Sequence, residues 1–184
     1  MKTVKKKRFS ADDWLLIGLQ VVRQQPPVRL TIDLLCEKAE RTRGSFYFHF
    51  ENMETYLGAL GEYWLDKFTS ELIRHSELQP TPRAKLDQLS TLAVRLDPLV
   101  DQGMRSLAAR EDSVRVYCKK VDETRLTYLE KLYRSTGKFS DEDATALANI
   151  EYAAMVGYQQ IKPDASPEET FQMYQAFLRL TGRA

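Results

Sequence analysis

Residues 31–50 read TIDLLCEKAERTRGSFYFHF, and this stretch decides how the rest of the chain is interpreted. Apolar side chains fall on one face of a first short helix over about residues 31–39, with Thr31 placed to cap its first turn. We expect a sharp bend near Arg41, followed by a second short helix over about residues 43–49. Two helices joined by about three residues are typical of a helix-turn-helix, whose second helix enters the major groove of DNA.

The second helix carries residue types that suit contact with DNA. Phe46 and Phe50 share one face at i and i+4 and are expected to anchor the helix in a small core. Arg43 carries a planar fork suited to guanine or to a phosphate, and Ser45 can reach a base edge. Phe48 offers an apolar face to a thymine methyl group. The other candidates are Thr31, Thr42, Tyr47 and His49 for phosphates, and Gly44 for close approach of the backbone to a neighbouring helix or to DNA.

The alternative interpretation is that these aromatic side chains are all core. Four aromatic residues within five positions cannot all face inward on a helix that turns about 100° per residue. Phe48 and part of Tyr47 are therefore expected to emerge beside Arg43 and Ser45.

Charge is distributed unevenly along the 184 residues, although the formal net charge is only +1. Residues 1–50 hold ten Lys and Arg against five Asp and Glu, a net charge of +5, whereas residues 51–184 hold 17 against 21, a net charge of −4. A basic front on an acidic remainder suggests that the front meets a polyanion. The apolar runs are too short for a membrane span, and two scattered cysteines favour a reduced, cytoplasmic protein.

The remainder of the chain also predicts helices, and no convincing alternation of period two occurs. Residues that commonly cap helices predict helix starts at Ser10, Thr81, Asp97, Ser140 and Ser166. Apolar residues from Tyr56 to Leu72 predict one long helix, and those from Val114 to Leu132 predict another that ends near Gly137. The expected fold is all-α with about nine helices.

The second helix of residues 31–50 resembles the recognition helix of the tetracycline-repressor (TetR) family. Residues 42–50, TRGSFYFHF, follow the family pattern of Ser/Thr, any, Gly/Ala, any, Leu/Phe, Tyr, any, His/Tyr and Phe, and Thr31-Ile32 matches the usual start of the preceding helix. The resemblance implies a three-helix DNA-binding domain, assigned to residues 1–53. It also implies a helical domain for ligand binding and dimerisation, assigned to residues 54–184.

Two positions depart from the family pattern. The turn usually carries Gly, where this chain has Glu40, and the following helix usually begins with a phosphate-contacting Lys, where this chain has Met53. DNA affinity is therefore expected to depend more on the Lys/Arg arm at residues 2–8, or to be lower.

The second half of the chain is expected to form a homodimer. By resemblance, its two last helices, over about residues 141–161 and 167–181, would pack against their mates as a four-helix bundle. Small or apolar residues on the first of these would let the helices approach closely: Ala144, Leu147, Ala148, Ala154 and Gly157. The alternative is that the same stripe is ordinary core within one chain.

A small-molecule effector is expected in the same half. Residues that could line its cavity are Arg105, Tyr117, Tyr128 and Tyr152, each of which is also plausible as a core tyrosine or an exposed arginine. No cofactor and no metal are expected, because His49 belongs to the DNA helix and His75 stands alone. Cys36 and Cys118 are expected to be small buried hydrophobes.

The sequence thus predicts a sequence-specific transcriptional regulator on a palindromic operator, most simply a repressor that a small molecule releases. One alternative is a TetR-like regulator with no effector. A helical enzyme is the other, but the chain offers no phosphate loop, nucleophile elbow or paired His and acid at a useful spacing.

Overall fold

The computed structural model describes residues 9–24 and 29–180, and every regular element within them is helical. The Lys/Arg arm and the double proline at residues 26 and 27 lie outside the described residues. The helices are α1 (Ala11–Val22), α2 (Ile32–Ala39), α3 (Arg43–Tyr47), α4 (Met53–Leu65), a π-helical segment η1 (Asp66–Ser70), α5 (Glu71–Glu77), α6 (Pro82–Ala93), α7 (Pro98–Ala108), α8 (Asp112–Ser135), α9 (Asp141–Ile161) and α10 (Pro167–Leu180). Because α4, η1 and α5 follow one another without a break, the described residues form nine helices, as predicted.

The predicted start signals act as caps. The side chain of Ser10 accepts a hydrogen bond from the backbone of Asp13, whose carboxylate accepts one from the backbone of Ser10 in return, which is a capping box. Thr81 and Asp97 each cap a helix that begins with proline. Short polar sequences therefore set where these helices begin.

The long helix from Met53 contains a feature that periodicity did not predict. Over Asp66–Ser70 it widens into a π-helical segment, between α4 and α5. Tyr56, Leu60 and Trp64 are fully buried before this segment, whereas Phe68 and Leu72 are only partly buried and line a cavity. π-Helical turns occur often at functional sites.

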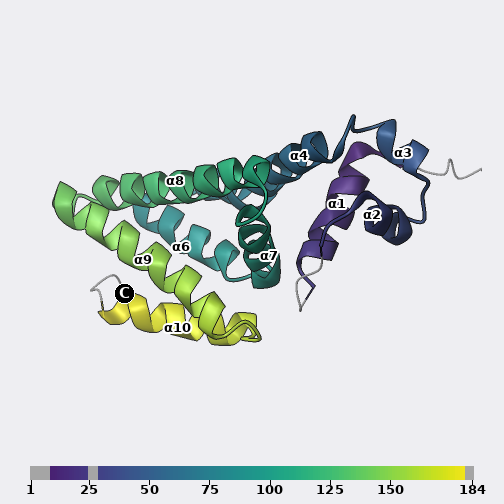
Figure 1. The fold of residues 1–184 in the computed structure, drawn as a ribbon. Helices are drawn as coiled ribbons and strands as arrows, with labels where there is room; N and C mark the ends of the chain where they lie inside the picture. Colours follow the sequence, from purple (N-terminus) through teal and green to yellow (C-terminus); the bar gives the residue numbers. More distant parts are fainter. Residues whose placement is uncertain (1–8, 25–28, 181–184) are drawn as a thin grey trace, which may run out of the picture.

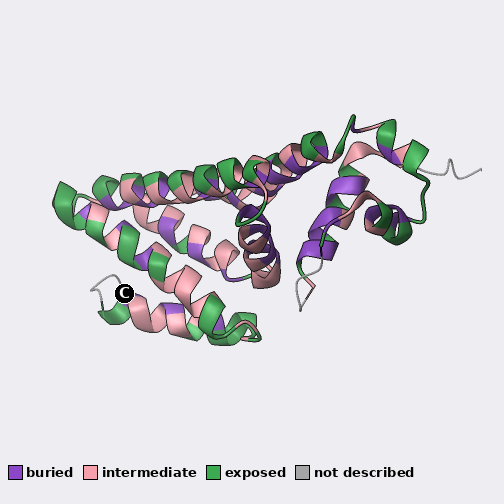
Figure 2. Cartoon of the chain, in the orientation of Figure 1, coloured by how far each residue is buried: buried purple, intermediate pink, exposed green. Residues whose placement is uncertain are grey.

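Two hydrophobic cores hold the fold together. The first joins α1–α4 to α7 and the first half of α8, and it includes Trp14, Phe46, Trp64 and Met104. The second lies around the later half of α8 and is built from α6, α8 and α9, with Leu86, Tyr133 and Ala148 among its members. Figure 1 shows α1–α3 at one end, with α10 on the far side of α9, and Figure 2 shows exposed residues on the outer helix faces. Helix α4 runs from the first end to pack along α8.

In the part of the chain that the structure describes, none of the helices combines the length and the apolar character of a membrane span.

Candidate functional site

The bend expected near Arg41 is present, and Glu40 makes it. Glu40 ends α2 in the left-handed conformation, with φ 51° and ψ 45°. The next backbone N–H, that of Arg41, donates to the carbonyl of Cys36 at 3.0 Å, which closes the helix end. Thr42 then caps α3, since its hydroxyl oxygen accepts from the N–H of Ser45 at 3.3 Å. The chain keeps the geometry of a helix-turn-helix without the glycine that usually supplies it.

Replacing Glu40 by glycine is expected to stabilise the protein by up to about 1 kcal/mol. A left-handed residue with a side chain costs roughly 1–2 kcal/mol, and the greater freedom of glycine in the unfolded chain offsets roughly half of that gain. Urea denaturation checks the difference. Lys38→Gly, inside the same helix, is the matched control and is expected to lose about 1 kcal/mol. Equal losses in both variants would contradict strain at Glu40.

One face of α3 is anchored in the first core. Phe46 is completely buried and Phe50 is 5% exposed. The ring of Phe46 lies 5.4 Å from that of Trp14 and 5.4 Å from that of Tyr56, measured between centroids. The Tyr56 hydroxyl donates to the carbonyl of Trp14 at 3.0 Å, and burial raises its pKa. These contacts fix how α3 is presented to solvent.

The opposite face of α3 projects outward. Phe48 is 69% exposed and Tyr47 is 50% exposed, as the helical angle required. Thr42, Arg43 and Gly44 are also exposed, while Ser45, His49 and Thr31 are partly buried. Thr31 caps α2, with its hydroxyl oxygen accepting from the N–H of Leu34 at 3.2 Å. All eight candidate DNA-binding residues therefore lie on or beside α3 and the start of α2.

Arg43 has a partner that the sequence did not predict. Its Nε and Nη2 donate to the two carboxylate oxygens of Asp33, each at 2.6 Å. Both side chains remain largely exposed, 62% for Arg43 and 69% for Asp33. The hydrogen bonds from Arg43 lower the pKa of the Asp33 carboxyl from its usual value. The bidentate pair joins α2 to α3 at their exposed surface.

Met53, at the position where the family pattern has a phosphate-contacting lysine, does not project fully into solvent. It opens α4 behind the capping side chain of Asn52, and it is half-buried against the first core. Exposed cations at this edge of the helix-turn-helix are thus fewer than the family pattern has.

A cavity of about 90 Å³ lies between η1, α5, α6, α7, α8, α9 and α10. This volume is roughly six times the minimum that one water molecule needs. Most of its wall is apolar, including Phe68, Leu72, Leu89, Leu129 and Met155. Of the four candidate ligand residues, Tyr128 and Tyr152 line it. The cavity has the mixed character of small-molecule sites, which combine an apolar wall with a few placed polar groups.

The other two candidates lie elsewhere. Tyr117 packs directly on α4, where a Cβ added to Gly61 would come within 2.6 Å of its ring, so this residue serves helix packing. Arg105 stands behind the cavity wall, and its Nη2 donates to the hydroxyl of Tyr152 at 2.8 Å. Tyr117 is thus not among the residues that line this cavity, and Arg105 is connected to it through two residues that do, Tyr152 and Asp101.

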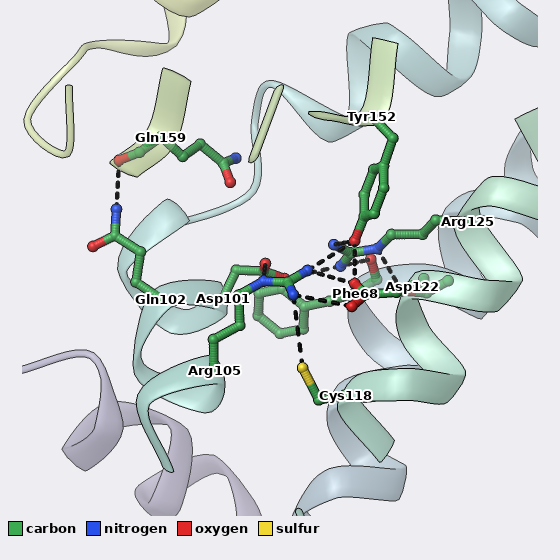
Figure 3. Close-up of polar contacts among 10 residues, drawn as sticks. Phe68, Asp101, Gln102, Arg105, Cys118, Asp122, Arg125, Tyr152 and Gln159 are labelled. Atoms are coloured by element: carbon green, nitrogen blue, oxygen red, sulfur yellow. Dashed lines mark hydrogen bonds and ion pairs between the residues drawn. The ribbon is translucent and has the colours of Figure 1, made fainter. Parts of the chain in front are cut away.

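Charged side chains from α7 and α8 form one network at this wall (Figure 3). Asp101, 7% exposed, accepts from Arg105 Nε and from Arg125 Nη2, both at 3.0 Å. Asp122 accepts from Arg105 Nη2 and from the Tyr152 hydroxyl, both at 2.6 Å. Arg125 also donates to the Thr69 hydroxyl at 3.0 Å and to the Phe68 carbonyl at 3.2 Å, both within η1. The network ties the π-helical segment to α7, α8 and α9.

The electrostatics of this network favour the charged forms of its carboxylates and guanidinium groups. Burial alone would raise the pKa of Asp122, but the hydrogen bonds from Arg105 and Tyr152 outweigh it and lower that pKa. Burial raises the pKa of Tyr152 to about 12, so its hydroxyl stays protonated and donates to Asp122. Two carboxylates and two guanidinium groups therefore neutralise one another beside the cavity.

A second buried carboxylate lines the cavity from α9. Glu151, 6% exposed, accepts from the hydroxyls of Tyr133 and Tyr174, and the hydroxyl of Tyr174 also contacts Ser90. This cluster connects α9 to α6, α8 and α10.

The two cysteines are free thiols in separate places. Cys36 is buried in the first core, and Cys118 lies 3.7 Å from Nη1 of Arg105. Burial raises the pKa of both thiols, which keeps them protonated.

Comparison with known proteins connects these features to one fold. A transcriptional regulator from Rhodococcus sp. Rha1 superposes with a TM-score of 0.77 at 15% identity, over 93% of this chain and 95% of that chain. The regulatory protein TetR from Rhodobacter sphaeroides superposes with a TM-score of 0.75 at 22% identity, over 93% and 98%. The fold is that of the TetR family. A third similar structure is that of the fatty acid degradation regulator FadR from Bacillus halodurans, with a TM-score of 0.65 at 16% identity, over 95% of this chain and 97% of that chain. No family model and no curated protein matches the chain.

The acidic residues at and beside the cavity were not predicted from the sequence. Asp101 of α7 and Glu151 of α9 come to line the cavity only because both helices pack against α8, and Asp122 of α8 contacts the cavity residue Tyr152. Arg125 did carry a signal, because it stands between Val121 and Tyr128 in an apolar stripe. A charged residue on such a face requires a buried partner.

Proposed function

We propose that the protein is a sequence-specific DNA-binding transcriptional regulator, in which residues 1–53 bind DNA and residues 54–184 dimerise and bind an effector. The observation that carries this proposal is the division of α3 into two faces. Phe46 and Phe50 fix the helix in the core, while Arg43, Tyr47 and Phe48 remain outside it. The similarity of the fold to solved structures of transcriptional regulators supports the same function.

In this proposal the candidate DNA-binding residues divide into two groups. Phosphate contacts fix register, and contacts with base edges carry specificity. Thr31, Thr42, Tyr47 and His49 would fix register on phosphates, and Arg43, Ser45 and Phe48 would contact base edges. Selection from random DNA duplexes tests the proposal. Enrichment of a two-fold symmetric motif is expected, and the absence of any enriched motif would contradict DNA recognition.

Gly44 allows a test that separates DNA binding from folding. A Cβ added there would meet only the Thr42 hydroxyl oxygen, at 3.7 Å, so no neighbouring helix requires a glycine. Gly44→Ala is therefore expected to leave the protein as stable as before or up to about 1 kcal/mol more stable. The same methyl group would stand between α3 and the DNA, and we expect roughly tenfold weaker binding to the selected duplex. Unchanged affinity would show that α3 does not approach DNA at Gly44.

The dimer is proposed to form through an exposed apolar stripe on α9. Its exposed members recur at helical spacing and are Ala146, Ile150, Ala153 and Ile161, of which Ile150 is 54% and Ile161 77% exposed, and the half-buried Gly157 lies between the last two. Ala144 and Ala148, by contrast, are buried in the core of their own chain against α8. The expectation that these two alanines serve the dimer is therefore wrong, and their neighbours on the outer face take that place.

Ile150→Glu is expected to convert the dimer to a monomer. An unpaired carboxylate in an apolar interface is costly, and dimerisation should weaken by on the order of tenfold or more. Analytical ultracentrifugation measures the change. Val116→Glu is the matched control, because Val116 is 52% exposed on α8, away from the stripe. Equal dissociation of both variants, or of neither, would rule out this face.

Effector control is proposed for the cavity beside Arg125 and Tyr152. A ligand that binds one spacing of the two DNA-binding domains better than the other shifts the population off an operator, whose successive major grooves lie about 34 Å apart. A screen of small molecules by thermal shift, followed by release of the selected duplex, tests this step. A regulator without an effector would show neither response.

A further inference from the structure

The pair of Asp33 and Arg43 has a geometry that bears on how α3 would read DNA. A guanidinium group has two edges that can each donate two parallel hydrogen bonds. Asp33 occupies the edge made by Nε and Nη2, with both distances at 2.6 Å. Among residues 9–24 and 29–180, Nη1 of Arg43 makes no hydrogen bond, and Nη2 keeps a second N–H. The edge made by Nη1 and Nη2 is left for another partner.

That second edge matches a base. Guanine presents O6 and N7 as neighbouring acceptors in the major groove, and a bidentate arginine is the commonest specific contact to them. An arginine on a flexible stem normally loses rotamer freedom when it binds. Here the carboxylate of Asp33 already fixes the orientation of the Arg43 guanidinium plane. The side-chain entropy of Arg43 is therefore lost when the protein folds and not when it binds DNA.

The pair also changes how Arg43 meets phosphates. An arginine without a partner is attracted by every phosphate, which strengthens binding to all sequences alike. Asp33 balances this charge on the exposed surface of α2, where its side chain is 69% exposed and would itself be repelled by the DNA backbone. Specific binding often depends on repulsive groups that disfavour unwanted contacts, here contacts with phosphates.

We propose that Asp33 is a specificity-determining residue that positions Arg43: it directs the Nη1 and Nη2 edge of Arg43 to a guanine and withholds Arg43 from phosphates. The inference rests on the proposed DNA-binding function. Asp33 acts here through Arg43 and needs no contact of its own with a base.

The competing interpretation is that the ion pair merely links α2 to α3. Exposed ion pairs contribute little to stability. A linking role would therefore leave base preference unchanged in variants that fold, and base preference separates the two interpretations.

The test compares base preference across four variants and the wild type. Asp33→Asn keeps the shape of the side chain and removes its charge, whereas Asp33→Ala removes both. Arg43→Ala removes the guanidinium group that is proposed to contact guanine. Glu37→Gln is the matched control, because Glu37 is exposed one turn further along α2 and makes no ion pair with a described residue. Each variant is first checked for folding by circular dichroism. Selection from random duplexes then gives the preference at every position, and titration of one unrelated duplex over a series of salt concentrations gives non-specific binding.

We expect the wild type and Glu37→Gln to prefer guanine by at least about fivefold at one position of each half-site. Both Asp33 variants and Arg43→Ala should lose this preference at that same position. In Asp33→Asn the released Arg43 should gain one phosphate, which steepens the slope of log affinity against log salt by about 0.9 on the unrelated duplex. Arg43→Ala should not steepen it.

Retention of the guanine preference in folded Asp33→Asn and Asp33→Ala would overturn the inference while leaving DNA recognition intact. A loss of preference at a different position from that in Arg43→Ala would overturn it equally. If the wild type enriched no motif, the proposed function would fail, and this inference would fail with it.

Discussion

Asp101→Asn is expected to lower the free energy of unfolding by about 3–5 kcal/mol, the range found when one partner of a buried ion pair is removed. The Asp101 side chain is 10% exposed, and its two oxygens serve Arg105 and Arg125, one each. An asparagine retains one acceptor oxygen but places an amide N–H₂ against a guanidinium group. The network would then hold one positive charge that nothing neutralises.

Urea denaturation, with fluorescence of the two tryptophans, measures this loss. Asp112→Asn is the matched control, since Asp112 pairs with Arg115 but is 88% exposed, and its expected change is within about 0.5 kcal/mol. A loss below about 1 kcal/mol in Asp101→Asn would mean that water or a rearranged Asp122 compensates the charge.

The elements of the fold were predictable because their signals are local. Ser10, Thr81 and Ser140 each cap a helix through contacts within three residues, so the sequence alone contains both partners. The bend before α3 was predictable for the same reason. The π-helical segment was not, because Asp66–Ser70 differs from ordinary helix only through its tertiary partners, among them Arg125 at the Phe68 carbonyl.

The candidate sites divide in the same way. The two faces of α3 follow from the helical angle, so the burial of Phe46 and the exposure of Phe48 could be predicted. The partner of Arg43 lies ten residues away across a bend, and nothing in the spacing distinguishes Asp33 from Glu37 or Glu40. The cavity depends on six helices, and side chains as far apart as Ser90 and Tyr174 meet there. Such contacts require the packing of the whole chain.

Gly103→Ala is expected to destabilise the protein by about 1–3 kcal/mol, the usual cost of overpacking. A Cβ at Gly103 would lie 2.1 Å from the carbonyl oxygen of Val22 and 2.6 Å from its carbonyl carbon. These are backbone atoms at the end of α1, so no side-chain rotation can relieve the overlap and α1 must move away from α7. The gain in helix propensity from glycine to alanine is about 1 kcal/mol and offsets only part of this cost.

The same substitution tests whether α7 connects the two halves of the molecule. Asp97, which caps α7, and Asp101 within α7 both line the cavity. At the same time, Gly103 of α7 contacts α1, and Asp97 pairs with Arg23 at 2.8 Å. Displacing α1 should therefore weaken binding to the selected DNA duplex although α3 is unaltered. Gly58→Ala is the control, because nothing lies within 4 Å of an added Cβ there, and it should raise stability by up to about 1 kcal/mol and leave DNA affinity unchanged. If Gly103→Ala matched this control in both measurements, α7 would not be the element that couples the cavity to the DNA-binding helices.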